Sequence, residues 1–266
     1  MNDFSISAIH AWGLAVLFAT GLLAGFVDSI AGGGGLITLP VVMSVGLPPQ
    51  LALGTNKLQA CFGSATAAAH HARAGTVSLR DSMRGIIFTV VGATIGTLLV
   101  QQLNPAFLKQ FIPVILLVIV AYVLLRPELG TADLHPRMAP GRFYALAGLG
   151  LGFYDGFLGP GTGSFWTMAF MLGLGFNMTR ATGYTKVMNC ASNLVSFALF
   201  AAQNKVLYGA GVTMGVGQLI GARVGSGMVI TRGAKFIRPI FITMVLAVTV
   251  KLLYDAYGRQ LNMPRA

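Results

Sequence analysis

The chain consists of long apolar stretches separated by short breaks that are polar or rich in glycine and proline. A helix of about 20 apolar residues crosses the roughly 30 Å hydrocarbon core of a bilayer. The residue-by-residue alternation typical of membrane barrels is absent from these stretches. The pattern therefore predicts an all-α polytopic membrane protein. The expected apolar segments are 9–30, 36–45, 51–72, 86–103, 111–125, 143–158, 165–174, 187–202, 206–230 and 239–254.

Two of these stretches are interrupted by glycine clusters that follow an aspartate. Residues 25–35 read GFVDSIAGGGG, and residues 152–163 read GFYDGFLGPGTG. Each glycine destabilises a helix interior by about 1 kcal/mol, so both clusters are expected to end a helix. The apolar segments 36–45 and 165–174 that follow are too short to cross a bilayer comfortably. We expect them to be re-entrant half-helices or the second parts of broken helices.

The two parts of the chain repeat each other. Lys57 corresponds to Lys186 and Cys61 to Cys190, both at an offset of 129 residues. We therefore predict two homologous halves, each with about three to four spanning helices plus a broken or re-entrant glycine-rich segment. The predicted organisation is a first transmembrane repeat over 1–126, a cytoplasmic linker over 127–142 and a second transmembrane repeat over 143–266.

Loop charge indicates how the two halves are oriented. Residues 73–84, after the Lys57 segment, carry three arginines, whereas the equivalent loop after the Lys186 segment carries only Lys205. Residues 104–110 contain one lysine, but the equivalent residues 231–238 contain three basic residues. Because basic loops face the cytoplasm, the halves are expected to be inverted repeats with the N-terminus outside. Three basic residues near the C-terminus argue against this topology.

Composition agrees with a membrane protein and excludes several other classes. The chain is 55% hydrophobic and 9% charged, against roughly 25% charged residues in soluble domains. Its net charge of +11 is scattered over short loops, which favours a role in topology over nucleic-acid binding. No enzyme signature occurs, so we expect neither catalysis nor a cofactor. The two cysteines and the pair His70-His71 are expected to be structural, with no disulfide or metal site.

Charged residues inside the apolar segments require an explanation, because each costs roughly 3 kcal/mol near mid-membrane. These residues are Asp28, Lys57, Asp155, Lys186 and Arg223. One explanation is structural: Asp28 pairs with Lys57 and Asp155 with Lys186, and the pairs hold the broken helices together. Another is that both lysines extend their ammonium groups to the membrane surface.

A third explanation is an anion site. Helical spacing places Lys186, Asn189 and Asn193 on one stripe, and Asn56 and Gln59 lie beside Lys57 in the other half. A polar stripe within a membrane must face protein or water. Helices that begin after a glycine break also present free N–H groups, which bind anions. This combination predicts a cavity for a small oxyanion where the two halves meet.

Four motifs resemble the sulfite exporter TauE/SafE family, also called the toluene sulfonate uptake permease family. They are GFVDSIAGGGG at 25–35, LGTNKLQA at 53–60, GFYDGFLGPGTGS at 152–164 and GQLIGA at 217–222. The resemblance implies a multi-pass protein of the bacterial inner membrane that moves sulfite, thiosulfate or organosulfonates, mostly outward. It also implies that the anion binds between the halves.

The residue pattern and the resemblance together define the candidate site. The halves differ at two places, since Gln59 corresponds to Met188 and Thr94 to Arg223, so Arg223 is expected to supply extra positive charge for a dianion. The candidate substrate-binding residues are Asp28, Gly33, Gly34, Asn56, Lys57, Gln59, Asp155, Gly161, Thr162, Thr185, Lys186, Asn189, Asn193 and Arg223.

These observations predict a secondary transporter that exports a small sulfur-containing anion by alternating access. Two alternatives stay open: an uptake permease or channel for related anions, and a structural membrane protein that transports nothing. The expected partners are the anion and the lipid bilayer, and a homodimer is left open. No metal, cofactor or nucleic acid is expected.

Overall fold

A computed structural model describes residues 11–108, 114 and 135–232, and the regular structure within these residues is entirely helical. This confirms the predicted all-α class for the part of the chain that the structure describes. The predicted segments 111–125 and 239–254 and most of the linker lie outside it. The helices are α1 (Ala11–Ala31), α2 (Gly34–Ser44), α3 (Pro49–Arg73), α4 (Leu79–Gln102), α6 (Pro140–Phe157), α7 (Thr162–Leu174), α8 (Met178–Ala202) and α9 (Tyr208–Arg232).

Two helices begin earlier than the apolar pattern indicated, because polar side chains cap them. The Ser78 hydroxyl accepts a hydrogen bond from the backbone N–H of Asp81 at 3.3 Å, so α4 begins at Leu79. The Asn177 side chain accepts from the N–H of Arg180 at 3.0 Å, so α8 begins at Met178. Such caps satisfy the N–H groups that the first turn of a helix leaves unpaired. The polar first turns therefore belong to the helices.

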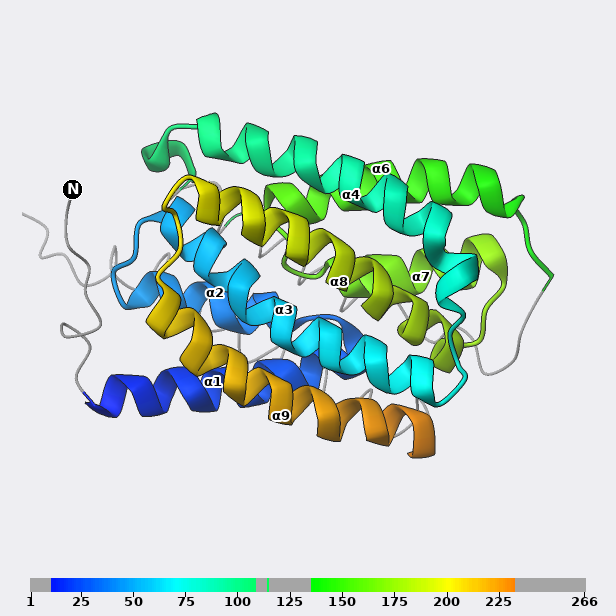
Figure 1. Ribbon diagram of the computed structural model, residues 1–266, viewed down its shortest axis with the longest axis horizontal. Helices are drawn as coiled ribbons and strands as arrows, with labels where there is room; N and C mark the ends of the chain where they lie inside the picture. Colours follow the sequence, from blue (N-terminus) through cyan, green and yellow to red (C-terminus); the bar gives the residue numbers. More distant parts are fainter. Residues whose placement is uncertain (1–10, 109–113, 115–134, 233–266) are drawn as a thin grey trace, which may run out of the picture.

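Helices from the two parts of the chain pack against each other. The long helices α3 and α8 lie side by side in the centre and run in opposite directions (Figure 1). Helix α1 packs along α9 on one side, and α4 packs along α6 on the other. The short helices α2 and α7 pack against α3 and α8, respectively. The centre of the molecule is therefore built from α3, α8 and the helix breaks beside them.

Glycines allow the outer helix pairs to approach closely. A Cβ atom at Gly25 of α1 would overlap the backbone of Gln218 in α9. A Cβ atom at Gly96 of α4 would likewise overlap the backbone of Phe153 in α6. Small residues four apart on a helix permit this kind of backbone contact in membrane proteins.

Among the described helices, α1 (over Gly13–Ile30) and α4 (over Leu79–Gln102) are long and apolar enough to cross a membrane. Helices α3, α8 and α9 have 25 residues each, about 37 Å at a rise of ~1.5 Å per residue, but contain more polar residues. The number of spans per half therefore stays a prediction. The outward face of α4 is apolar at every turn, with exposed side chains at Leu79, Met83, Ile87, Val91 and Ile95.

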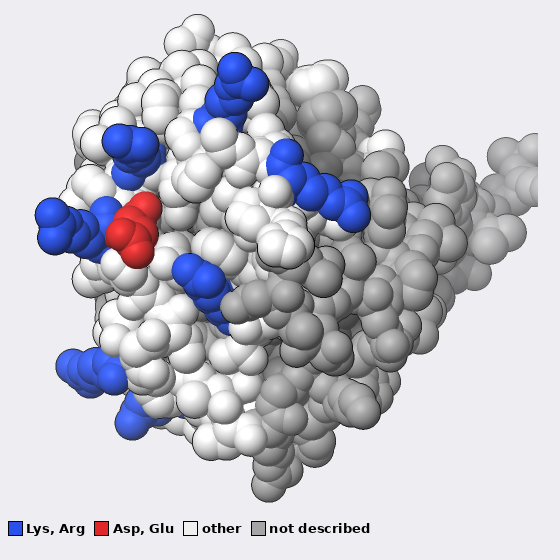
Figure 2. Space-filling view, turned by 90° about the vertical axis from the view of Figure 1, so that its right-hand side faces the viewer, with Lys and Arg blue, Asp and Glu red and all other residues white. Residues whose placement is uncertain are grey.

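Basic side chains gather at one end of the molecule. Figure 2 shows this end, where α3 finishes and α4, α6 and α8 begin. Arg73 lies in the last turn of α3, Arg80 and Arg84 in the first turns of α4, and Arg142 near the start of α6. At the opposite end, the described loops 45–48, 103–108 and 203–207 contain Lys205 as their one basic residue. The two ends of the described molecule, along its long axis, therefore differ in positive charge.

Candidate functional site

Both predicted helix breaks are present, and they lie against each other. Helix α1 ends at Ala31 and α2 begins at Gly34, with Gly32 between them at a φ of +75°. Helix α6 ends at Phe157 and α7 begins at Thr162, after Gly161 at a φ of +79°. Positive φ is costly for residues with a Cβ. At Gly32 a Cβ would also overlap the backbone of Gly163. Glycine is therefore needed both for the turn and for the contact between the two breaks.

The ammonium group of Lys57 is fully bonded next to the second break. Its Nζ donates to the Asp155 carboxylate at 2.7 Å, to the Asp155 backbone carbonyl at 2.5 Å and to Asn193 Oδ1 at 3.2 Å. An ammonium group has three N–H donors, so none is left for another acceptor. The second carboxylate oxygen of Asp155 accepts from the Ser192 hydroxyl. Lys57 is 2% exposed.

Lys186 makes the corresponding contacts at the first break. Its Nζ donates to the Asp28 carboxylate at 3.0 Å and to the Asp28 backbone carbonyl. The other oxygen of Asp28 accepts from the backbone N–H of Gly34 at 3.3 Å, at the start of α2. Lys186 is completely buried. Neither ammonium group is exposed at the protein surface. The explanation that both lysines extend to the membrane surface is therefore wrong.

The ion pairs therefore cross between the two parts of the chain. The sequence had suggested Asp28 with Lys57 and Asp155 with Lys186, and this pairing is wrong. Helices α3 and α8 lie side by side and run in opposite directions, so each lysine reaches the helix break of the other half. The contacts are Lys57 with Asp155 and Lys186 with Asp28.

A small cavity lies between the two breaks and the central helices. Its volume is about 30 Å³, which leaves room for about two water molecules. Most of the predicted site residues line it, namely Asp28, Asn56, Lys57, Gln59, Asp155, Gly161, Thr162, Asn189 and Asn193. The structure thus brings together residues 28–59 of the first half and residues 155–193 of the second half.

Other lining residues were not among the candidates, namely Gly32, Gly35, Ala60, Gly159, Gly163 and Gln218. The glycines and Ala60 offer backbone but no side-chain chemistry. Gln218 is different, because it brings a polar side chain from α9 to the cavity and is 2% exposed. It belongs to the GQLIGA motif at 217–222, so a polar residue among small apolar ones was the signal that could have identified it.

The remaining candidates lie behind the cavity or away from it. Gly33 is the residue before α2, and Gly34 donates its N–H to Asp28. The Thr185 hydroxyl is buried 3.1 Å from that of Thr167. Arg223 is exposed on α9 and does not line the cavity. The expectation that Arg223 supplies charge to a bound dianion is therefore wrong in this structure, because its guanidinium lies outside the central helices.

Hydrogen bonds among amide side chains connect the cavity to α2. Gln59 Nε2 donates to Asn56 Oδ1 at 2.9 Å and to Thr38 Oγ1 at 3.3 Å. Thr38 donates in turn to Asn56 Oδ1 at 2.5 Å. This network joins the short helix after the first break to the helix that carries Lys57. The network therefore ties α2 to α3 at residues next to Lys57 in sequence.

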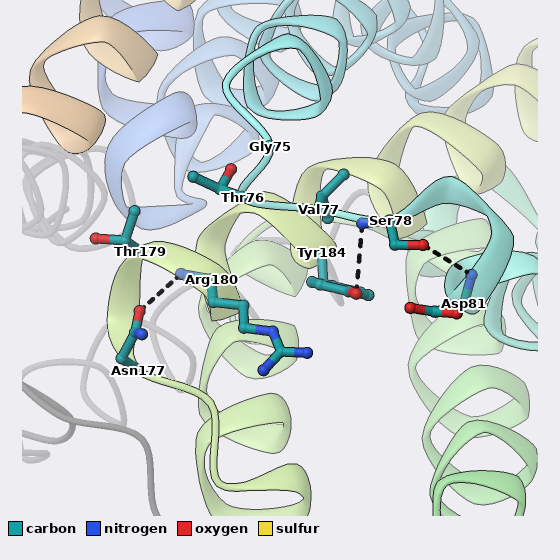
Figure 3. A pocket seen from close by; sticks show the side chains of 9 residues that line it. All are labelled: Gly75, Thr76, Val77, Ser78, Asp81, Asn177, Thr179, Arg180 and Tyr184. Carbon is teal, nitrogen blue, oxygen red and sulfur yellow. Dashed lines mark hydrogen bonds between the residues drawn. The ribbon is translucent and has the colours of Figure 1, made fainter.

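A second, larger pocket of about 540 Å³ lies at the basic end, and its lining residues are drawn in Figure 3. It is formed by the loop before α4 and the start of α8. The backbone N–H of Ser78 donates to the Tyr184 hydroxyl at 3.4 Å across this pocket. The Arg180 guanidinium lies 4.0 Å from the centre of the Phe176 ring, a cation–π contact. The pocket is separate in sequence from the glycine breaks.

Both cysteines are free thiols in the structure, Cys61 buried and Cys190 partly buried.

Comparison with known proteins gives a consistent picture. Residues 17–252 match the family model described as "Sulfite exporter TauE/SafE". The chain is 45% identical over 248 residues to "Probable membrane transporter protein YfcA" of Escherichia coli (strain K12), covering 93% of this chain and 92% of that protein. It is similarly 45% identical to "Probable membrane transporter protein" of Haemophilus influenzae, covering 91% and 95%. It is 42% identical to "Probable membrane transporter protein ORF9" of Sinorhizobium sp, covering 91% and 93%. No solved structure matches the chain.

Proposed function

Because the chain belongs to the sulfite exporter TauE/SafE family, we propose that it is a secondary transporter that exports a small sulfur-containing anion. Sulfite, thiosulfate and organosulfonates are the substrates we consider. The family and the membrane transporters to which the chain is similar support a location in the membrane. We further propose that the protein crosses the bacterial inner membrane several times.

Inverted repeats are part of this proposal, and three observations support them. The order of long and short helices recurs, with 21, 11, 25 and 24 residues in α1–α4 and 18, 13, 25 and 25 residues in α6–α9. Corresponding helices run in opposite directions (Figure 1). The packing of α1 on α9 corresponds to that of α6 on α4. An inverted repeat provides two related arrangements of one site, which alternating access requires.

The observation that carries the proposal is the pair of crossed lysine–aspartate contacts at the two glycine breaks. Each contact joins a lysine on a central helix of one half to an aspartate at the break of the other half. A movement of one half relative to the other would separate lysine from aspartate. The freed ammonium, together with N–H groups at the starts of α2 and α7, would then attract an anion.

Substrate binding must involve competition at the lysines. All three N–H groups of Lys57 already have acceptors, and the cavity has room for only about two water molecules. We therefore propose that the arrangement seen here is closed. An entering anion takes the place of a carboxylate at an ammonium group while the cavity widens.

Transport in proteoliposomes tests this proposal. Vesicles are loaded with sulfite, thiosulfate, an organosulfonate or sulfate, and efflux is measured for the wild-type protein, Lys57→Ala and Lys186→Ala. Lys205→Ala is the matched control, because Lys205 lies in a loop and donates to the carbonyl of Gln101, away from the cavity. We expect both cavity variants to lose efflux by at least tenfold and the control to keep it. Full activity in both cavity variants would exclude the site.

The rival possibility is that the ion pairs only hold the helices together. Exchanging the partners, as Asp155→Lys with Lys57→Asp, distinguishes a purely structural ion pair from an anion site. A purely structural pair tolerates the exchange, whereas an anion site at the central helix loses its positive charge there. We expect the exchanged protein to insert and fold but to transport no anion. Transport at the wild-type rate would favour the structural alternative for this pair.

A further inference from the structure

Three buried side-chain oxygens at the central cavity have no hydrogen-bond partner. They are Gln59 Oε1, Asn189 Oδ1 and Gln218 Oε1, on side chains that are at most 5% exposed. All three residues line the same cavity of about 30 Å³. A buried amide oxygen left without a partner costs roughly 1–3 kcal/mol. Three such oxygens around one space indicate a ligand that interacts with hydrogen-bond acceptors.

The ammonium groups near the cavity are directed to other acceptors. Lys57 directs its three N–H groups to Asp155 and Asn193, and Lys186 is bonded to Asp28. The orientation of Gln59 is set by its amide nitrogen, which donates to Asn56 and Thr38. Its oxygen therefore points away from that network. The cavity therefore combines two neutralised ion pairs with three unpaired amide oxygens.

A single water molecule does not satisfy all three oxygens, because water donates only two hydrogens. One small metal cation can bind all of them at once. Hard cations prefer oxygen ligands, and a cavity of about 30 Å³ has room for such an ion. The C-terminal end of α1 points toward the first break, and the carbonyl end of a helix carries partial negative charge. Discontinuous helices hold cations in this way in other transporters.

We propose that Gln59, Asn189 and Gln218 form a binding site for one sodium ion. A monovalent ion leaves less uncompensated charge than a divalent one, because the carboxylates of Asp28 and Asp155 are each neutralised by a lysine. The Asp28 oxygen that accepts the 3.3 Å hydrogen bond from Gly34 also has a free lone pair, so it can serve as a fourth ligand to the ion.

The site is asymmetric, and the chain itself supplies the variants to test it. At the offset of 129 residues that relates the halves, Met188 stands in the place of Gln59 and Thr89 in the place of Gln218. The Thr89 hydroxyl lies 3.5 Å from the Met188 sulfur. Gln59→Met and Gln218→Thr therefore introduce residues that this fold already accommodates at the related positions. A single sodium ion per chain follows from this difference.

Sodium binding gives the proposed transport a source of positive charge, and this part of the inference rests on the proposed function. The cavity is neutral with its two ion pairs formed, so an anion entering alone would leave an uncompensated buried charge, which is expensive. A sodium ion bound in the same cavity balances it. Binding and transport of the anion are then coupled to sodium.

The first experiment measures sodium binding without any substrate. The melting temperature of the purified protein in detergent is recorded in chloride salts of sodium, potassium and choline at constant ionic strength. A ligand that binds only the folded state raises the melting temperature with its concentration. We expect a saturable rise in sodium for the wild-type protein, with at least a tenfold weaker response in Gln59→Met and Gln218→Thr.

Gln101→Met is the matched control. Gln101 is also a buried glutamine whose Oε1 has no partner, but it does not line the cavity. It should keep the wild-type response. Gln218→Asn, which keeps the amide but shortens the side chain by one methylene, replaces Gln218→Thr if that variant fails to fold. Equal melting temperatures in all three salts, or a wild-type sodium response in both cavity variants, would overturn the site.

A second experiment separates this inference from the proposed function. Uptake of radioactive sodium into proteoliposomes is measured with and without the anion that the protein transports. Saturable sodium uptake in the wild-type protein that increases with the anion and is lost in Gln59→Met supports both proposals. Anion flux of equal rate with sodium or choline on both sides contradicts sodium coupling but leaves the transport function intact. Sodium stabilisation without any anion flux contradicts transport and leaves the cation site.

Discussion

At the residue scale, the main feature is that each central lysine is surrounded by acceptors from the other half. Lys57 is 2% exposed and makes three hydrogen bonds, two of them to Asp155. Desolvation of a buried ion pair offsets much of its attraction, so such a pair stabilises little compared with apolar residues of similar size. Removing one partner is different, because the other charge stays buried without compensation. Stability and transport should therefore respond differently to single and double substitutions.

We predict that Lys57→Met alone lowers the free energy of unfolding by about 3–5 kcal/mol, because Asp155 is left unpaired. The double variant Lys57→Met with Asp155→Leu should recover most of that loss and still transport no anion. Unfolding in mixed detergent micelles measures the first effect, and proteoliposome efflux the second. A double variant as unstable as the single one would show that the pair itself stabilises the fold.

At the element scale, the helix breaks decide where the site lies. Gly32 combines a φ of +75° with a position where a Cβ would overlap the backbone of Gly163. Gly150 lies in the middle of α6, and a Cβ there would meet no atom within 4 Å. The same substitution at these two glycines therefore tests the break against an ordinary helical position.

We predict that Gly32→Ala destabilises the protein. The left-handed backbone costs about 1–2 kcal/mol for alanine, and the overlap with Gly163 adds about 1–3 kcal/mol. Gly150→Ala should instead be neutral or stabilise by up to about 1 kcal/mol, because alanine favours the helix. Thermal unfolding of the two variants in detergent compares them. Equal stability would mean that the two breaks do not need their close contact.

At the scale of the whole molecule, charge distinguishes the two ends. The end shown in Figure 2 carries the arginines of α3, α4 and α6, and the described loops at the other end carry Lys205. Basic loops stay in the cytoplasm during insertion. With the arginine-rich end inside, α1 would begin outside, as its lack of basic residues also indicates.

We predict that Ala74→Cys and Gln203→Cys, in a background without the native cysteines, label from opposite sides of the membrane. Both positions are exposed, and they follow the equivalent helices α3 and α8. A membrane-impermeant maleimide should modify Gln203→Cys in intact cells and Ala74→Cys only after permeabilisation. Labelling of both from the same side would exclude the inverted arrangement.

Sequence alone determined the helical class, the two glycine breaks and most of the residues that line the cavity. These features depend on local properties: apolar length, the low helix propensity of glycine and the cost of charge in a membrane. They could therefore be predicted from neighbouring residues along the chain. The caps Ser78 and Asn177 extended two helices beyond the apolar pattern, because polar first turns carry no hydrophobic signal.

Only the tertiary structure decided which aspartate meets which lysine, that Arg223 lies outside the cavity, and that Gln218 lies within it. The physical reason is that these contacts depend on how α3, α8 and α9 pack and in which direction they run. From the sequence alone, either lysine could pair equally well with either aspartate. The rotation of each helix about its axis decides which of its side chains face inward. Close glycine contacts, between α1 and α9 and between α4 and α6, fix how these helices pack, and they join segments far apart in sequence.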